Sequence, residues 1–180
     1  MIMLGCKPEG RLTEQHDIFF GVSNSLKELI PKMKAFWPEA KGKIHIDAWR
    51  EVTVVDNFKI EVVDEISEID NEKDLFFINL GGYKPNEFEE YHYKILAVAP
   101  TLGMAAKKCK ESVFYKHCGF AGAISHIDDK FGIDVDELYN VKEILNKYNF
   151  KKLNLKITKT NVTLPEDALH IGYLQISKIV

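Results

Sequence analysis

The sequence contains few cysteines, and none of them forms a closely spaced pair. Cys6, Cys109 and Cys118 are an odd number without a Cys-x-x-Cys arrangement. Domains stabilised by disulfides usually carry an even set, and cysteine-rich zinc sites need such pairs. The cysteines therefore argue against both kinds of protein and favour a reducing, cytoplasmic location.

Arginine is also scarce, and long apolar runs are absent. Arg11 and Arg50 are the only arginines among 24 basic residues, and the formal net charge is −3. Nucleic acids and anionic membranes attract basic surfaces, and lysine lacks the rigid fork that binds phosphate or guanine. No segment approaches the roughly 18 apolar residues of a membrane span. We therefore expect no nucleic acid and no membrane as a partner. A small molecule or a protein remains possible as the partner. The oligomeric state is left open.

What the sequence does contain is an internal repeat. Residues 2–34 align without a gap onto residues 78–110, and His45-Ile46-Asp47 is later answered by His126-Ile127-Asp128. The identical pairs in the ungapped part are Ile2/Ile78, Leu4/Leu80, Gly5/Gly81, Glu14/Glu90, His16/His92, Val22/Val98, Leu26/Leu102, Lys32/Lys108 and Lys34/Lys110. Self-similarity of this kind is typical of a duplicated structural unit.

Each copy opens with a short apolar run, a glycine-containing link that reverses the chain, a second strand and a helix. These elements are residues 1–4, 5–10, 16–22 and 25–37 in the first copy, and 75–80, 81–86, 92–98 and 101 onward in the second. The first helix begins with the capping-box spacing of Ser25 and Glu28. Pro31 predicts a kink or a restart inside it, and Pro38 predicts its end.

The rest of the chain adds further strands. Residues 45–55 and 58–63 predict a hairpin about Asp56-Asn57, and 153–158 and 170–176 predict a second hairpin that covers a sheet edge. We therefore expect an α+β fold with two tandem β-β-α-β repeats, related by a pseudo-two-fold axis, plus a C-terminal β-hairpin. The expected divisions are residues 1–64 for the first unit, 75–149 for the second and 150–180 for the C-terminal part.

Three segments resemble a known protein family. They are LGGYKPNEFEEYHYK, HIDDKFGIDVD and HIDAWREV, and they are similar to the bacterial proteins grouped as domain of unknown function 1543. The resemblance extends to about residue 145. It implies a bacterial, intracellular, duplicated α+β protein, and it brings no established catalytic residues.

Four of the six histidines lie two positions from an acid, in matched places of the two copies. The candidate metal ligands are Glu14, His16, His45 and Asp47, and their counterparts Glu90, His92, His126 and Asp128. Residues i and i+2 of a strand project from the same face, about 6–7 Å apart, so each pair can converge on one ion. Two histidines and two carboxylates suit a divalent metal such as zinc or iron.

The same residues also permit other interpretations. A histidine beside a carboxylate can be a structural device that fixes a strand register, and a duplication copies such devices as readily as sites. Alternatively, the groups can serve as a general base and its orienting acid. We therefore expect a non-catalytic module that binds a small molecule or a protein, with a metal-dependent hydrolase as the alternative. Whether the chain is an enzyme, and with which cofactor, is left open.

Overall fold

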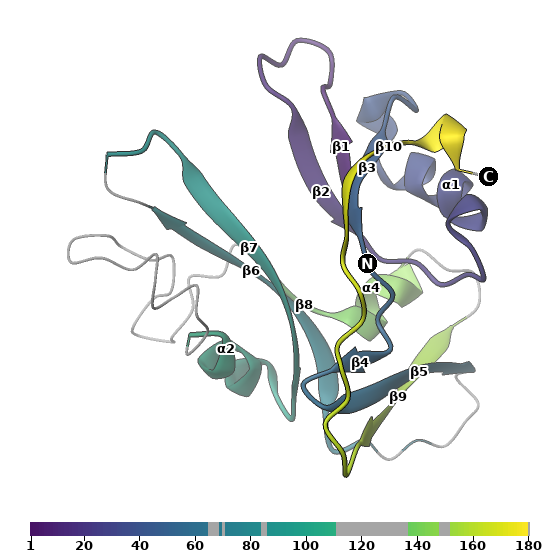
Figure 1. Cartoon of the computed structure of the whole chain (residues 1–180), viewed down its shortest axis with the longest axis vertical. Helices are drawn as coiled ribbons and strands as arrows, with labels where there is room; N and C mark the ends of the chain where they lie inside the picture. The colour runs from purple at the N-terminus through teal and green to yellow at the C-terminus, as the bar shows by residue number, and fades with distance from the viewer. Residues whose placement is uncertain (65–68, 70, 84–85, 111–136, 148–151, 180) are drawn as a thin grey trace.

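The computed structural model describes residues 1–64, 69, 71–83, 86–110, 137–147 and 152–179. Within these residues the chain forms three antiparallel sheets and several short helices, so the expected mixed α+β fold is confirmed. Figure 1 shows two hairpins that diverge from a common base, with helices on their outer sides. None of the described helices is long and apolar enough to cross a membrane.

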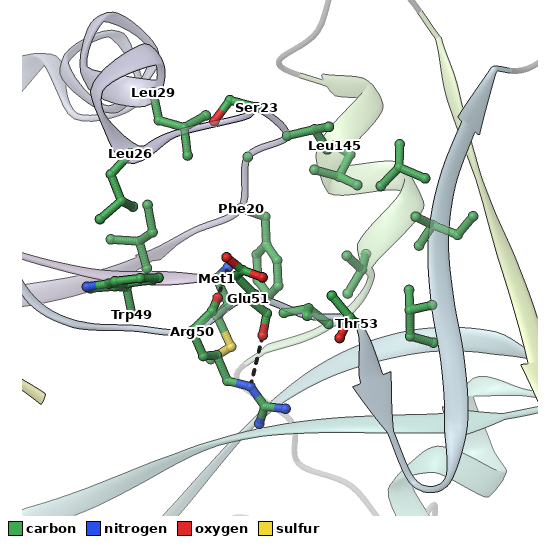
Figure 2. Close-up of a pocket in the computed structure, with 18 of the residues that line it drawn as sticks. Met1, Phe20, Ser23, Leu26, Leu29, Trp49, Arg50, Glu51, Thr53 and Leu145 are labelled. Atoms are coloured by element: carbon green, nitrogen blue, oxygen red, sulfur yellow. Dashed lines mark hydrogen bonds between the residues drawn. The ribbon is translucent and has the colours of Figure 1, made fainter. Parts of the chain in front are cut away.

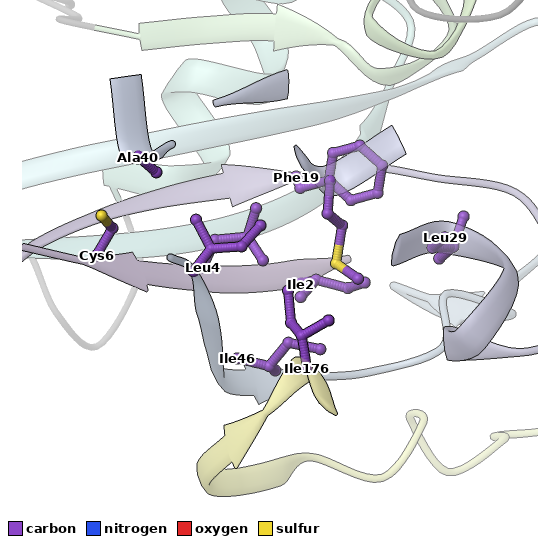
Figure 3. Close-up of a cluster of buried hydrophobic side chains, with 10 residues drawn as sticks. Ile2, Leu4, Cys6, Phe19, Leu29, Ala40, Ile46 and Ile176 are labelled. Atoms are coloured by element: carbon purple, nitrogen blue, oxygen red, sulfur yellow. The ribbon is translucent and has the colours of Figure 1, made fainter. Parts of the chain in front are cut away.

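The first sheet has the strand order β10-β3-β1-β2. Its strands are β1 (Ile2–Cys6), β2 (Gln15–Phe19), β3 (His45–Trp49) and β10 (His170–Gln175). Alternate residues of β1, namely Ile2, Leu4 and Cys6, point toward helix α1 (Leu26–Phe36), as the period of two in a strand requires. Figure 3 shows these side chains meeting those of β3 and α1 in one core.

Helix α1 begins where the sequence predicts. The Ser25 side chain accepts a hydrogen bond from the Glu28 backbone N–H, and the Glu28 carboxylate accepts one from the N–H of Asn24. The helix continues through Pro31 without a restart and ends at Phe36, just before a short 3-10 helix that starts at Pro38. The predicted end is therefore confirmed. Of the two alternatives predicted at Pro31, the restart is absent and the kink stays a prediction.

The third sheet has the order β7-β6-β8. It consists of β6 (Asp74–Tyr83), β7 (Glu90–Ala99) and β8 (Glu137–Asn140), and helix α2 (Leu102–Lys110) packs on one face of it. Both faces of β6 are buried. Phe76 and Ile78 pack toward α2, whereas Leu75 and Phe77 pack toward the central core. This two-sided burial explains why the sequence of β6 is an almost continuous apolar run.

The second sheet joins the other two. It has the order β4-β5-β9, and its strands are β4 (Val54–Val55), β5 (Phe58–Asp64) and β9 (Leu153–Lys159). The predicted turn at Asp56-Asn57 is confirmed, because both residues have positive φ, as a two-residue hairpin requires. The central core lies between this sheet, β6 and helix α4 (Val141–Lys147).

The expected C-terminal β-hairpin is wrong. Both strands exist, but β9 pairs with β5 and β10 pairs with β3, in different sheets. The link between them is fixed elsewhere, because Asp167 accepts hydrogen bonds from the backbone N–H groups of Thr53 and Val54. Strand β9 therefore covers an edge of the second sheet and β10 covers an edge of the first. A hairpin made of these two strands would not cover both edges.

Candidate functional site

Four of the predicted ligands converge in the first half of the chain. His16 Nε2 lies 3.3 Å and His45 Nε2 lies 3.2 Å from the same oxygen, Asp47 Oδ2. The carboxylate of Glu14 reaches both rings as well, at 3.0 Å from His45 Nε2 and 4.0 Å from His16 Nε2. We call these four residues the His–carboxylate cluster. The structure brings together the whole set that the sequence predicts for this half.

The strand register places the two histidines. Gly5 of β1 pairs with His16 of β2 on one side and with His45 of β3 on the other. Directly opposed residues of antiparallel strands project from the same face, so both rings stand on the face of the sheet that is opposite to α1. Gly5 has no side chain between them. A Cβ atom at this position would clash with His45 Nε2 and Asp47 Oδ2.

An irregularity in β3 positions the aspartate. Leu4 pairs with Ile46 and Met3 pairs with Ala48, so Asp47 is an extra residue with no partner in β1. Bulges of this kind redirect a side chain and are frequent next to functional sites. Here the bulge leaves the Asp47 carboxylate in contact with both imidazoles.

The cluster is buried at one end and open at the other. The exposed fraction of the side chain rises from 12% for His45 and 21% for Asp47 to 41% for His16 and 43% for Glu14. His45 Nε2 and Asp47 Oδ2 are buried atoms, yet neither has a hydrogen-bond partner among the described residues. The nitrogen and oxygen atoms are therefore close to one another without being aligned as hydrogen bonds.

Tyr173 of β10 covers the buried end of the cluster. Its ring centroid lies 4.5 Å from that of the His45 imidazole, with the planes tilted by 43°. Farther along the same two strands, Trp49 and His170 stack at 3.8 Å with nearly parallel rings. Strand β10 thus fixes the His45 ring from the side away from β1.

The second half presents only part of the matching set. His92 Nε2 lies 3.8 Å from Glu90 Oε2, and each of the two side chains is 33% exposed. Gly81 pairs with His92 as Gly5 pairs with His16. His126 and Asp128 lie outside the described residues. The predicted chain reversals are confirmed, because β1 and β2 pair antiparallel, as do β6 and β7. The assignment of Gly5, Gly81 and Gly82 to the links is wrong, because Gly5 belongs to β1 and the other two belong to β6.

His16 also faces a cleft of about 840 Å³. The cleft lies between β2 and the third sheet, on the inner side of the two diverging hairpins in Figure 1. Asn79 of β6 and His92 and Lys94 of β7 line its opposite wall. Asn79 Oδ1 is buried without a hydrogen-bond partner in the described part of the chain. The exposed end of the cluster therefore opens into a space large enough for a small molecule.

The charges that line this cleft are mainly negative. Arg11 and Lys94 are its cations, and burial lowers the pKa of Lys94, although the nearby Glu137 carboxylate raises it. The acidic residues in the described lining are Asp17, Glu39, Glu89, Glu90 and Glu137. Such a lining favours a cation or a neutral polar molecule over a phosphate.

The sequence did not identify every residue of the site. The identity of Gly5 and Gly81 in the repeat pointed to this position, but their interpretation as turn residues hid the role of Gly5. No sequence signal places Tyr173 against His45, because β10 is far away in the chain and has no counterpart in the repeat.

Among the described residues, no group of three or more His, Cys, Asp and Glu side chains is arranged so that it could hold a metal ion as it stands. In the His–carboxylate cluster the side chains contact one another directly. A metal ion would enter it only with small movements of these side chains. The chemistry of the four groups nevertheless fits zinc or ferrous iron, because two neutral imidazoles and two carboxylates supply nitrogen and oxygen ligands and two negative charges.

Comparison with known proteins confirms the family resemblance. The model of the Domain of Unknown Function (DUF1543) matches residues 11–62. This segment contains all four residues of the His–carboxylate cluster, but it does not contain Gly5 or Tyr173. No curated protein matches the chain.

The fold is similar to that of a solved structure. The crystal structure of a protein Il1583 from Idiomarina loihiensis matches with a TM-score of 0.54 and 21% sequence identity. The match covers 96% of this chain and 93% of that chain. At this level of identity the likeness concerns the fold alone.

Proposed function

We propose that this protein is a cytoplasmic binding module that holds a divalent transition-metal ion in the His–carboxylate cluster. The observation that carries the proposal is the convergence of His16 Nε2, His45 Nε2 and the carboxylates of Glu14 and Asp47, without hydrogen bonds that would satisfy His45 and Asp47. The free thiols of Cys6 and Cys109 fit a reducing compartment.

The spacing of the donor atoms supports this proposal. Zinc–nitrogen and zinc–oxygen bonds of about 2.0–2.2 Å place tetrahedral ligands about 3.3–3.6 Å from one another. The four measured separations between the imidazole nitrogens and carboxylate oxygens are 3.0, 3.2, 3.3 and 4.0 Å. These separations are close to that range, and the two rings contact different oxygens of the Glu14 carboxylate.

A purely structural role agrees less well with the same observations. A histidine that only fixes the strand register should complete hydrogen bonds, because an unpaired buried polar atom costs about 1–3 kcal/mol. His45 Nε2 does not complete one, even though two carboxylate oxygens lie within 3.2 Å of it. The open end of the cluster at His16 also differs from what a buried structural pair would need.

The experiment that tests the proposal is a titration of the metal-free full chain with Co²⁺ and Zn²⁺. We expect one Co²⁺ per chain, with the visible absorption of a four-coordinate site, and displacement of Co²⁺ by Zn²⁺. His45→Gln should weaken binding by about 100-fold or more, since removing only a group that orients a ligand costs about 10–100-fold. His92→Gln is the matched control and should leave the affinity unchanged.

Two results would refute the proposal. The first is a native chain that binds Co²⁺ no more tightly than His45→Gln does. The second is equal weakening by His45→Gln and His92→Gln, which would place the ion elsewhere. If His45→Gln instead lowers only the free energy of unfolding and the native chain binds no metal, the structural interpretation is correct.

The cleft beside His16 favours a metal-dependent hydrolase as a second candidate function. A bound ion would lie next to a space for substrate, and metal coordination lowers the pKa of water so that it can attack at neutral pH. His92 and Glu90 on the opposite wall would then contact the substrate. The test is hydrolysis of a panel of neutral and cationic nitrophenyl esters by the zinc-loaded protein. Activity that His92→Gln reduces without loss of zinc would support an enzyme.

We also propose that residues 1–64 and 75–149 arose by duplication, with a pseudo-two-fold relation between them. The strand registers support this, because Ile2 pairs with Phe19 in the first half and Ile78 pairs with Ile95 in the second, at the spacing of 76 that the sequence repeat predicts. In both halves a helix follows the hairpin, and a later strand then pairs with the first strand.

A further inference from the structure

We infer that a second pocket, separate from the His–carboxylate cluster, binds a neutral small molecule with an apolar body and one hydrogen-bonding end. The pocket has a volume of about 440 Å³ and lies where the first sheet meets the central core. Figure 2 shows Leu26, Leu29 and Trp49 on one side of it and Leu145 on the other. None of the four cluster residues lines this space, so the inference does not depend on the proposed function.

The apolar walls come from separate elements of the fold. Leu29 belongs to α1, whereas Ile60 and Leu155 belong to the paired strands β5 and β9, and Leu145 belongs to α4. Leu29 belongs to the core of the first sheet, whereas Ile60, Leu145 and Leu155 belong to the central core. Protein interiors normally leave few voids larger than a water molecule. A space of this size with apolar walls lies within the range of small-molecule pockets, about 300–1,000 Å³.

The charge balance of the walls indicates a neutral ligand. The ionisable groups of the pocket lining are Arg50, Glu51 and the amino group of Met1. The Met1 amino group donates a hydrogen bond to the Arg50 carbonyl oxygen, and burial lowers its pKa to about 6, so it is mostly uncharged at pH 7. The Arg50 guanidinium lies 3.4 Å from Glu166 and 3.7 Å from Asp167. It also donates hydrogen bonds to the carbonyl oxygens of Glu51 and Val54. These four partners occupy four of the five N–H groups of the guanidinium, which leaves one for an anionic ligand. A carboxylate or phosphate ligand would therefore gain little binding free energy from Arg50, and removing water from its charge would be unfavourable.

The uncharged polar residues of the lining are Ser23, Asn24 and Ser25 in the loop before α1, and Thr53, whose hydroxyl already bonds to Asp167. Ser23 and Asn24 line the pocket, and the Ser23 hydroxyl is already committed as a donor to the carbonyl oxygen of Ser25. The Asn24 side-chain amide can both donate and accept. The ligand class is thus an apolar molecule, of the size of two fused or linked rings or a medium-length chain, with one hydroxyl, carbonyl or amino group that reaches Asn24.

The test uses N-phenyl-1-naphthylamine, a neutral two-part aromatic amine whose fluorescence rises in an apolar site. The full chain should bind one equivalent saturably. Val62→Trp places a large ring at the mouth of the pocket from a position on β5 that is 42% exposed, and it should weaken binding at least about tenfold. Val162→Trp is the matched control, because Val162 is also exposed but does not line the pocket. It should bind as the native chain does.

Two further variants make the outcome decisive. Asn24→Leu removes the polar end of the site without adding bulk, and it should weaken binding about threefold or more even if Val62→Trp fails to fold. Ile171→Ser removes an exposed apolar side chain of β10, next to the exposed Tyr173. This variant detects dye that adheres to the surface of β10 instead of entering the pocket. Binding that is not saturable, that survives Val62→Trp in a folded chain, that Asn24→Leu leaves unchanged or that Ile171→Ser abolishes would overturn the inference.

Discussion

The most direct test of the site geometry is the substitution Gly5→Ala. Gly5 lies in the middle of β1, and the added methyl group would occupy the space that His45 Nε2 and Asp47 Oδ2 now fill. The φ angle of Gly5 is not in the left-handed region, so the backbone accepts alanine without strain. The whole effect of the substitution should therefore come from contact with the cluster.

The expected magnitude follows from two opposing effects. Forcing an extra methyl group into an occupied space usually costs about 1–3 kcal/mol. Replacing glycine by alanine inside a strand returns roughly 0.5–1 kcal/mol, since alanine has fewer unfolded conformations to lose. We expect a net loss of about 1–2 kcal/mol in the free energy of unfolding, which lowers the melting temperature by about 3–6 °C in a chain of this size.

The assay is urea denaturation of Gly5→Ala, His45→Ala and the double variant. Removing the imidazole removes one of the two groups that the methyl group contacts, so Gly5→Ala should cost about 1 kcal/mol less in the His45→Ala background. Gly103→Ala is the control, because a Cβ atom there meets nothing within 4 Å. It should leave stability unchanged or raise it by less than about 1 kcal/mol.

Two outcomes would refute this reasoning. If Gly5→Ala is as stable as the native chain, the space above Gly5 is not occupied as described. If the cost of Gly5→Ala is the same with and without the His45 ring, the loss comes from the backbone of β1 instead of the cluster. In either case the convergence of His16 and His45 on Asp47 would lose its main geometric support.

Two other predictions concern Asp167, which is partly buried, and Cys109, which is buried. Asp167→Ala should cost about 2–3 kcal/mol at pH 7, since the Asp167 carboxylate accepts hydrogen bonds from Thr53 and Val54. Burial tends to raise the Asp167 pKa, but these hydrogen bonds lower it overall. The stabilisation is therefore present above the unfolded pKa of 3.8 and lost as the pH falls through the lower folded pKa. A cost in urea denaturation that stays the same at pH 2 and pH 7 would contradict this. Burial, with a smaller contribution from Asp56, raises the pKa of Cys109 to about 11. Cys109 should thus resist a thiol reagent at pH 8 in the folded chain, and labelling as fast as in urea would contradict its burial.

Local signals in the sequence predicted most of the first half of the fold. The capping pair Ser25 and Glu28, the stop at Pro38 and the turn at Asp56-Asn57 act over a few residues, so they can be read without knowledge of the tertiary structure. Pro31 shows the limit of such signals. Its missing N–H did not interrupt α1, because packing of the apolar face supports the helix on both sides of it.

The pairing of the last two strands could not be predicted in the same way. Residues 153–159 and 170–175 each have a strand pattern, but their partners β5 and β3 lie about 90 or more residues earlier in the chain. A pattern of alternating residues identifies a strand and not its neighbour. The choice is made by contacts such as those of Asp167 with Thr53, which no local sequence signal indicates.

Part of the His–carboxylate cluster could be predicted from spacing within one strand, whereas the role of Gly5 could not. The i and i+2 spacing of His45 and Asp47 is a property of one strand, so the sequence alone placed both on one face. His16 lies beside these two residues only because Gly5 of β1 pairs with both His16 and His45. The register also explains why a glycine is needed between the two rings.

The two halves differ in what they can do chemically, although their strand registers correspond. In the first half, Ile18 follows His16 on the same face and packs into the central core. At the corresponding place in the second half stands Lys94, whose side chain lines the cleft with His92. A lysine two positions from a histidine disfavours a second cation beside it. If the metal proposal is correct, the first half therefore holds the ion, and the second half supplies the wall that faces it.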